Sequence, residues 1–217
     1  MAHHRSPALS ERDIRLALDT TSQILLEAGQ THPIRLLVVG GAVSVLRWRN
    51  RPTTQDVDVY PEDAASWERV HAASRTAGVR LNWGAFDWLN NRAARFIDAD
   101  GAMRQWAGRG FVPDGRQTVV YQSRALILIA MPWNLQLQQK LRRLTGGALI
   151  GGQREADMID AVELVREVCT EHRRGISATE VLNWHAVNRL GINWDVMATV
   201  SARYRGRYPN AAGLNMV

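Results

Sequence analysis

The stretch from Leu36 to Tyr60, LLVVGGAVSVLRWRNRPTTQDVDVY, constrains the fold of this chain more than any other segment. It predicts a buried strand, a turn at two glycines, a short helix, a polar loop and a second strand. The second strand carries Asp56 and Asp58, and residues two apart in a strand point to the same face, roughly 6.5 to 7 Å apart. Their neighbours Val57 and Val59 point the other way, into a core. The segment therefore indicates a site for a hard cation beside a glycine turn, an arrangement suited to chemistry on phosphates.

The two carboxylates allow a second interpretation. Acids on one strand face repel each other unless a cation or an arginine offsets their charge. They could be solvated acids at a strand end, bridged to the arginines of the preceding loop. The chain also contains a second Asp-x-Asp pattern, Asp98 and Asp100, in an irregular region, so the pattern arises easily.

The glycine pair Gly40–Gly41 is open to two interpretations as well. It could be a tight turn from strand to helix, or it could let backbone amides at the helix start approach a triphosphate. It is not a P-loop, because no Lys-Ser/Thr follows at the required spacing, and it lacks the third glycine of a dinucleotide-binding fingerprint.

Composition narrows the choice of partners. The net charge is +6, and only Lys140 is a lysine, so arginine supplies almost all positive charge. Arginine matches phosphate bidentately, which suits a polyanionic partner, although a basic surface can also simply keep a protein soluble.

A single cysteine, Cys169, excludes an internal disulfide and fits a reducing compartment. The longest apolar run, 125–131, is too short to span a membrane, and the N-terminus lacks a signal core. We expect a soluble, intracellular, cytoplasmic protein.

The pattern along the chain predicts an α+β fold. In the first part, Ser10 and Asp13 mark a helix start. We expect helices over about 10–29, 42–47, 62–77 and 87–96, strands over 34–39 and 56–60, a glycine-rich loop over 101–115, and paired strands over 117–122 and 125–131. Strand–helix alternation fails after residue 78, which argues against a doubly wound parallel sheet.

The second part is predicted to be helical. We expect helices over about 132–144, 154–172, 178–189 and 194–204, a flexible connector over 145–152 and a loosely held tail after Pro209. This divides the chain into an α+β core with an N-terminal helix, residues 1–131, and a helical part, residues 132–217, packed on that core.

Three further features have competing interpretations. Arg47, Arg49 and Arg51 could clamp phosphates or an RNA backbone, or they could belong to a solvated loop. Trp48, between two of them, is the tryptophan placed to stack on a base. Lys140 could neutralise phosphate charge, or it could form helix–helix ion pairs with the acids of the 154–172 helix, Asp157 and Asp160.

The segment VVGGAVSVLRWRNRPTTQDVDVY resembles the core of the nucleotidyltransferase fold of the DNA polymerase β type. The stretch RPTTQDVD resembles the Arg-x-Thr-x-Asp-x-Asp motif of the minimal nucleotidyltransferases related to abortive-infection toxins, but it contains one extra residue. DWLNNRAARFI resembles the Trp-Leu-Asn segment of an uncharacterised branch of these proteins. LILIAMPWNLQLQQKLRRL and READMIDAVEL resemble that branch's helix with a lysine and its helix with paired aspartates. The resemblance covers about residues 34–167.

The resemblance implies a small mixed sheet of nucleotidyltransferase type and a transferase chemistry. Asp56 and Asp58 would bind Mg²⁺, or Mn²⁺, on a nucleoside triphosphate such as ATP. An acceptor hydroxyl would attack the α-phosphorus and pyrophosphate would leave, with two metal ions about 3.5 to 4 Å apart stabilising the attacking and leaving oxygens. The residues implied to contact the nucleotide are Gly40, Gly41, Arg47, Thr54, Lys140 and Asp157. The arginine content makes RNA, for example tRNA, a reasonable acceptor. The base, the acceptor and the oligomeric state do not follow from the sequence.

The chain departs from this family in one respect. Active members place a third carboxylate on a later strand, but TVVYQS and ALILIAM contain no acid, and Gln122 is the candidate for that position. Asp98, Asp100 and Asp114 are the substitutes that remain. An amide cannot serve as a base. The missing acid leaves open an enzyme that uses one metal ion. The alternatives to an enzyme are a non-catalytic nucleotide- or RNA-binding module of the same fold and an interaction protein whose acids are ion-paired.

Overall fold

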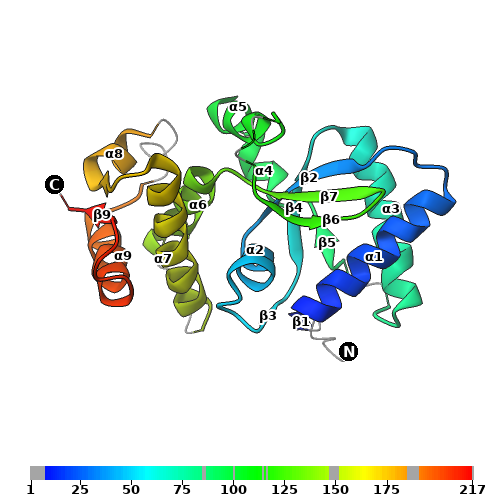
Figure 1. The fold of residues 1–217 in the computed structure, drawn as a ribbon, viewed down its shortest axis with the longest axis horizontal. Helices are drawn as coiled ribbons and strands as arrows, with labels where there is room; N and C mark the ends of the chain where they lie inside the picture. Colours follow the sequence, from blue (N-terminus) through cyan, green and yellow to red (C-terminus); the bar gives the residue numbers. More distant parts are fainter. Residues whose placement is uncertain are drawn as a thin grey trace. The chain divides into compact units, whose positions relative to one another are not determined.

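The structure is a computed structural model that describes residues 8–84, 87–99, 101–113, 115, 117–146, 152–184 and 191–216. The chain divides into two compact units, Met1–Met131 and Pro132–Val217. The first unit contains the main sheet, and the second is mostly helical (Figure 1).

The first unit is built on a five-stranded mixed sheet with the order β5-β4-β2-β7-β6. The central strand β2 (Ile34–Val39) lies antiparallel to β4 (Val57–Pro61) and parallel to β7 (Leu126–Ala130). At the edges, β5 (Leu89–Asn90) pairs parallel to β4, and β6 (Val119–Gln122) pairs antiparallel to β7. The predicted α+β class, a small mixed sheet flanked by helices, is confirmed.

Two long helices, α1 (Glu11–Glu27) and α3 (Ala64–Arg80), belong to this unit and lie beside the sheet (Figure 1). The predicted start of α1 is confirmed: Asp13 N donates to Ser10 Oγ, and the Asp13 carboxylate accepts from Ser10 N, a reciprocal cap that satisfies two free amides. Tyr121 on β6 donates to Asp19 on α1 at 2.8 Å.

The segment after β2 combines a glycine turn with a short, irregular helix. Gly40 has φ +73°, and it leads into α2 (Gly41–Val43) and a π-helical turn, η1 (Ser44–Trp48). The loop after η1 is fixed by strand pairing, because β3 (Thr53–Thr54) pairs antiparallel with β1 (Leu9–Ser10). The beginning of the chain therefore supports the loop that precedes the two acids.

Two expectations for residues 87–115 are wrong. The segment over 87–96 is not one helix, because Leu89 and Asn90 form β5 and only Ala94–Ile97 form a helix, α4. The expected loop over 101–115 contains the helix α5, Gly101–Arg109. Nothing lies within 4 Å of a Cβ added at Gly101 or Gly108, so packing does not require glycine at either position, and a glycine inside a helix costs only about 1 kcal/mol relative to alanine.

The second unit consists of α6 (Trp133–Thr145), α7 (Gly152–His172), α8 (Ala178–Asn183) and α9 (Trp194–Arg207). These agree with the expected helices, except that α8 ends at Asn183 and residues 185–190 lie outside the described part. Most of the expected connector, residues 147–151, also lies outside it.

The tail is anchored, contrary to expectation. Its strand β9 (Leu214–Asn215) pairs parallel with β8 (Ile176–Ser177), and Ser201 Oγ donates to Leu214 O at 2.5 Å. Leu214 is buried, so its apolar side chain holds the end of the chain in place.

Cys169 is buried in the second unit, and burial raises the pKa of its thiol. A thiol held in this protonated form is a poor nucleophile. Among the helices that the structure describes, none combines the length and apolar character needed to cross a membrane.

Candidate functional site

The two acids lie on the partly exposed face of the β4 segment. Val57 and Val59 are fully buried, whereas Asp56 and Asp58 alternate with them and remain partly exposed. The alternation predicted from the sequence is therefore present, although the strand begins at Val57, one residue later than expected.

Strand pairing brings the glycine turn next to the acids. In the β2–β4 register, Asp58 lies opposite Val39, the residue just before Gly40. A Cβ added at Gly40 would lie 4.0 Å from Asp58 Oδ2. The backbone of the turn and the second carboxylate are thus close neighbours with no side chain between them.

Packing also explains why the second glycine is needed. A Cβ added at Gly41 would lie 2.5 Å from Thr54 Oγ1 and 3.2 Å from Arg51 Nη1, both too close. Thr54 Oγ1 in turn donates to the backbone oxygen of Asp56 at 3.2 Å. Thr54 therefore lies between the turn and the acid-bearing segment, and its contact with a nucleotide stays a prediction.

The arginines of the loop differ in their surroundings. Arg51 lies at the glycine turn, as the distance to Gly41 indicates. Arg49, in the left-handed conformation, forms an ion pair with Glu11 at 3.1 Å. Arg47 lies in η1 with an exposed side chain. Of the three arginines considered for phosphate contact, Arg51 is thus the one that lies against the glycine turn.

The residue beside the acids on the neighbouring strand is Asn90, not Gln122. Gln122 lies on β6, which β2 and β7 separate from β4. Asn90 on β5 is the register partner of Asp58, and its side-chain Nδ2 donates to Asp56 Oδ2 at 3.1 Å. Gln122 was the candidate for the position of a third acid on a later strand, but its strand pairs with β7 and not with β4, so it does not lie beside the acids.

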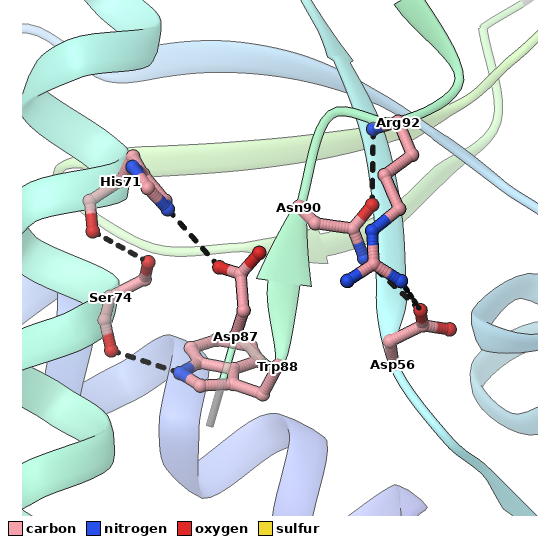
Figure 2. Close-up of polar contacts among 7 residues, drawn as sticks. All are labelled: Asp56, His71, Ser74, Asp87, Trp88, Asn90 and Arg92. Carbon is pink, nitrogen blue, oxygen red and sulfur yellow. Dashed lines mark hydrogen bonds and ion pairs between the residues drawn. The ribbon is translucent and has the colours of Figure 1, made fainter. Parts of the chain in front are cut away.

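Arg92 completes this polar group (Figure 2). Its backbone N–H donates to Asn90 Oδ1 at 3.0 Å, and its Nη1 lies 3.7 Å from Asp56 Oδ2. Sequence reasoning missed both Asn90 and Arg92. The available signal was a polar residue directly after the apolar pair Trp88–Leu89, within the Trp-Leu-Asn segment already noted.

The segment carrying Asn90 is fixed to α3 by its first residues (Figure 2). Trp88 is 1% exposed, and its Nε1–H donates to Ser74 O at 2.9 Å. His71 Nε2 lies 3.1 Å from Asp87 Oδ1. Val57 N donates to Trp88 O at 2.7 Å, which begins the pairing of β5 with β4. A buried tryptophan therefore sets the position of Asn90.

Asp98, the other considered acid that the structure describes, does not join this group. Asp98 accepts from Tyr60 OH at 2.9 Å and pairs with Arg104 at 3.2 Å. Burial raises the pKa of Tyr60 to about 12, and Asp98 acts in the same direction, so the phenol remains a donor. Asp100 and Asp114 lie outside the described residues. Within the described ranges, no group of three or more His, Cys, Asp or Glu side chains is arranged to hold a metal ion.

In the second unit, Lys140 and Asp157 form part of a buried ionic cluster between α6 and α7. Lys140 Nζ donates to Asp157 Oδ1 and to Asp160 Oδ2, each at 2.7 Å, and these three side chains are at most 7% exposed. Arg143 Nε lies 2.9 Å from Asp157 Oδ2, without the geometry of a hydrogen bond. The two cations balance the two acids, which is the helix–helix ion pairing that the sequence left open.

The donor set of the first unit fits a magnesium ion. Mg²⁺ prefers carboxylate and other oxygen ligands, and it keeps several waters when one or two carboxylates hold it. Asp56 and Asp58 supply carboxylates on one face, and the glycine turn lies against Asp58. The site is thus compatible with one cation and a phosphate.

No family model matches the sequence, and the search of curated proteins found no match. Among solved structures, the chain is similar to an antigenic nucleotidyltransferase-like protein from Paracoccidioides brasiliensis, with a TM-score of 0.49 and 13% sequence identity. The alignment covers 96% of this chain and 97% of that chain.

Proposed function

We propose that this protein is a nucleotidyltransferase, which transfers a nucleotidyl group from a nucleoside triphosphate such as ATP to an acceptor. The observation that carries the proposal is the adjacency of Gly40 and Asp58, with a hypothetical Cβ only 4.0 Å from the carboxylate. A phosphate bound to the amides of the turn would lie next to the acids that hold its metal ion.

Each site residue of the first unit has a defined role in this proposal. Asp56 and Asp58 hold Mg²⁺ or Mn²⁺, the amides of Gly40 and Gly41 bind phosphate oxygens, and Thr54 and Arg47 contact the nucleotide. Bound Mg²⁺ would neutralise charge on the phosphates and on the leaving pyrophosphate. The acceptor hydroxyl forms a bond to the α-phosphorus, the bond to pyrophosphate breaks, and the hydroxyl proton passes to water.

The role of Lys140 and Asp157 in nucleotide binding stays a prediction. An ammonium has three N–H donors, and two of those on Lys140 are used by Asp157 and Asp160. The cluster supports a structural role for both residues, and the two roles predict different effects of substitution.

RNA is the acceptor that the composition favours, because 27 basic residues stand against 21 acidic ones and nearly all the basic residues are arginines. Arginine forks match phosphate oxygens bidentately. We therefore propose RNA, for example tRNA, as the first acceptor class to test.

A second candidate function is a non-catalytic nucleotide-binding module of the same fold. It is favoured by one observation: within the described part of the chain, Asp56 and Asp58 have no third carboxylate beside them, and the neighbouring position carries Asn90. Without that acid, a base for the acceptor hydroxyl is missing.

Both candidates can be tested in one assay. The protein is incubated with each α-labelled triphosphate, Mg²⁺ or Mn²⁺, and total RNA or protein. Label transfer that disappears in Asp56→Ala and Asp58→Ala, but not in Asp98→Asn, supports the enzyme, because Asp98 contacts Tyr60 and Arg104 instead. Metal-dependent nucleotide binding without transfer supports the binding module. Neither transfer nor binding would refute both.

A further inference from the structure

Asp56 has two positively polarised neighbours, and both approach the same oxygen. Asn90 Nδ2 donates to Asp56 Oδ2 at 3.1 Å, and Arg92 Nη1 lies 3.7 Å from that oxygen (Figure 2). Within the described residues, Asp56 Oδ1 has no hydrogen bond or ion pair. One oxygen is thus held by the protein, and the other is left for a ligand.

The amide of Asn90 has a fixed orientation. Its Oδ1 accepts from Arg92 N at 3.0 Å, so its Nδ2 must face Asp56, since a backbone N–H can only donate. Asn90 is 2% exposed, and water has little access to replace either bond. An amide here can hold a carboxylate by donation, whereas an aspartate would repel it.

Arg92 acts by charge rather than by a hydrogen bond. A separation of 3.7 Å is too long for a good hydrogen bond but short enough for Coulombic attraction. The Arg92 side chain is 65% exposed, so it can leave or turn without breaking the core. Asp56 is therefore partly neutralised before any metal ion binds.

The charges limit how many metal ions this group accepts. Asp56 and Asp58 carry two negative charges, and Arg92 supplies one positive charge. Within the described residues no third carboxylate joins these two, so a second divalent cation would have no carboxylate of its own and would be repelled by the charge of Arg92 beside Asp56.

We propose that the acid pair is a one-metal site, in which Asn90 is a positioning residue that holds Asp56 and Arg92 supplies the positive charge that a second metal ion would otherwise provide. This inference rests on the proposed function, because it concerns the metal site at Asp56 and Asp58. It assigns roles to Asn90 and Arg92, for which the sequence alone indicated none.

The test is a titration of the full chain with Mn²⁺ alone, with free Mn²⁺ measured by electron paramagnetic resonance. The wild type is expected to bind one Mn²⁺. Arg92→Leu should bind it about fivefold more tightly, because a competing charge worth roughly 1 kcal/mol at this distance in water is gone. Arg92→Lys should restore the wild-type affinity, and Arg95→Leu, which removes an exposed charge three residues away, should leave it unchanged.

Asn90→Asp is the second variant. Aspartate can still accept from Arg92 N but adds a third carboxylate, so affinity should rise about tenfold or more, or a second Mn²⁺ should bind. A merely structural Asn90 would give a less stable protein with no gain in Mn²⁺ affinity. If Asn90→Asp does not fold, the Arg92→Leu and Arg92→Lys variants test the proposal by themselves.

The outcomes separate the inference from the function. Two equivalent Mn²⁺ ions in the wild type, or unchanged affinity in Arg92→Leu, overturn the one-metal site while leaving the proposed function standing. If the protein binds no Mn²⁺, or if binding persists in Asp58→Ala, the acid pair holds no metal ion. That result refutes both the one-metal site and the proposed function.

Discussion

Asn90 donates a hydrogen bond to the carboxylate of Asp56 at 3.1 Å, across 34 residues of sequence. The contact exists because β5 pairs parallel with β4, in the register that places Asn90 opposite Asp58. It shows that three strands, not two, build the candidate site: β2 ends at the glycine turn, the β4 segment carries the acids, and β5 carries the amide.

Replacing Asp58 by Asn should abolish metal-dependent nucleotide binding. The amide keeps the size of the side chain but loses the negative charge, and we expect at least about a 100-fold loss of affinity in calorimetry with Mg²⁺ and ATP. Asp98→Asn is the matched control. Equal loss in both variants would mean that general charge, not the site, controls binding.

Gly40→Ala should weaken the protein and its nucleotide affinity together. Gly40 has φ +73° and ψ −142°, a conformation that costs an L-residue about 1–3 kcal/mol. Gly29 also has positive φ, +85°, but nothing lies within 4 Å of its Cβ position. Gly29→Ala should therefore lower the free energy of unfolding similarly while leaving nucleotide binding intact. Intact binding in Gly40→Ala would argue against a phosphate at the turn.

Trp88→Phe should destabilise the first unit by about 1–3 kcal/mol. Phenylalanine keeps most of the buried ring but leaves Ser74 O without the donor that now reaches it at 2.9 Å. Urea unfolding measures the change, and Trp194→Phe, at a more exposed tryptophan, is the control. Because Trp88 positions β5, Mn²⁺ affinity should fall as well. A variant with wild-type stability would show that this hydrogen bond does not hold the strand.

Lys140→Met should destabilise the second unit by about 3–5 kcal/mol, because two buried carboxylates lose their shared partner. The measurement is again urea unfolding. Glu171→Gln, at an exposed position on the facing helix α7, should change stability by less than about 0.5 kcal/mol. If Lys140→Met kept its stability but lost nucleotide affinity, the ligand role implied by the resemblance would hold instead.

Much of the fold was accessible from local pattern. β2 was predicted with the bounds that it has, Ile34–Val39, because a central strand buried on both faces reads as an apolar run between turn residues. The helix α7 was predicted because its apolar residues recur at spacings of three and four. Both signals lie within one element and need no knowledge of its neighbours.

The wrong predictions concern segments whose structure depends on contacts with distant parts of the chain. Leu89–Asn90 is a two-residue strand, too short for a period to show, and it exists because Trp88 is buried beside α3 and its backbone accepts from Val57. The end of the chain was expected to be loose, yet Leu214 is buried and its strand pairs with β8.

The sequence alone determined the acid pair and the glycine turn, because strand alternation and turn chemistry are local and the two strands that carry them are close in sequence. Only the tertiary structure decided what surrounds that pair. Strand order placed Asn90 and Arg92 beside Asp56 and kept Gln122 two strands away. Pairing between distant segments depends on burial and register across the whole unit, and no single stretch of residues determines either.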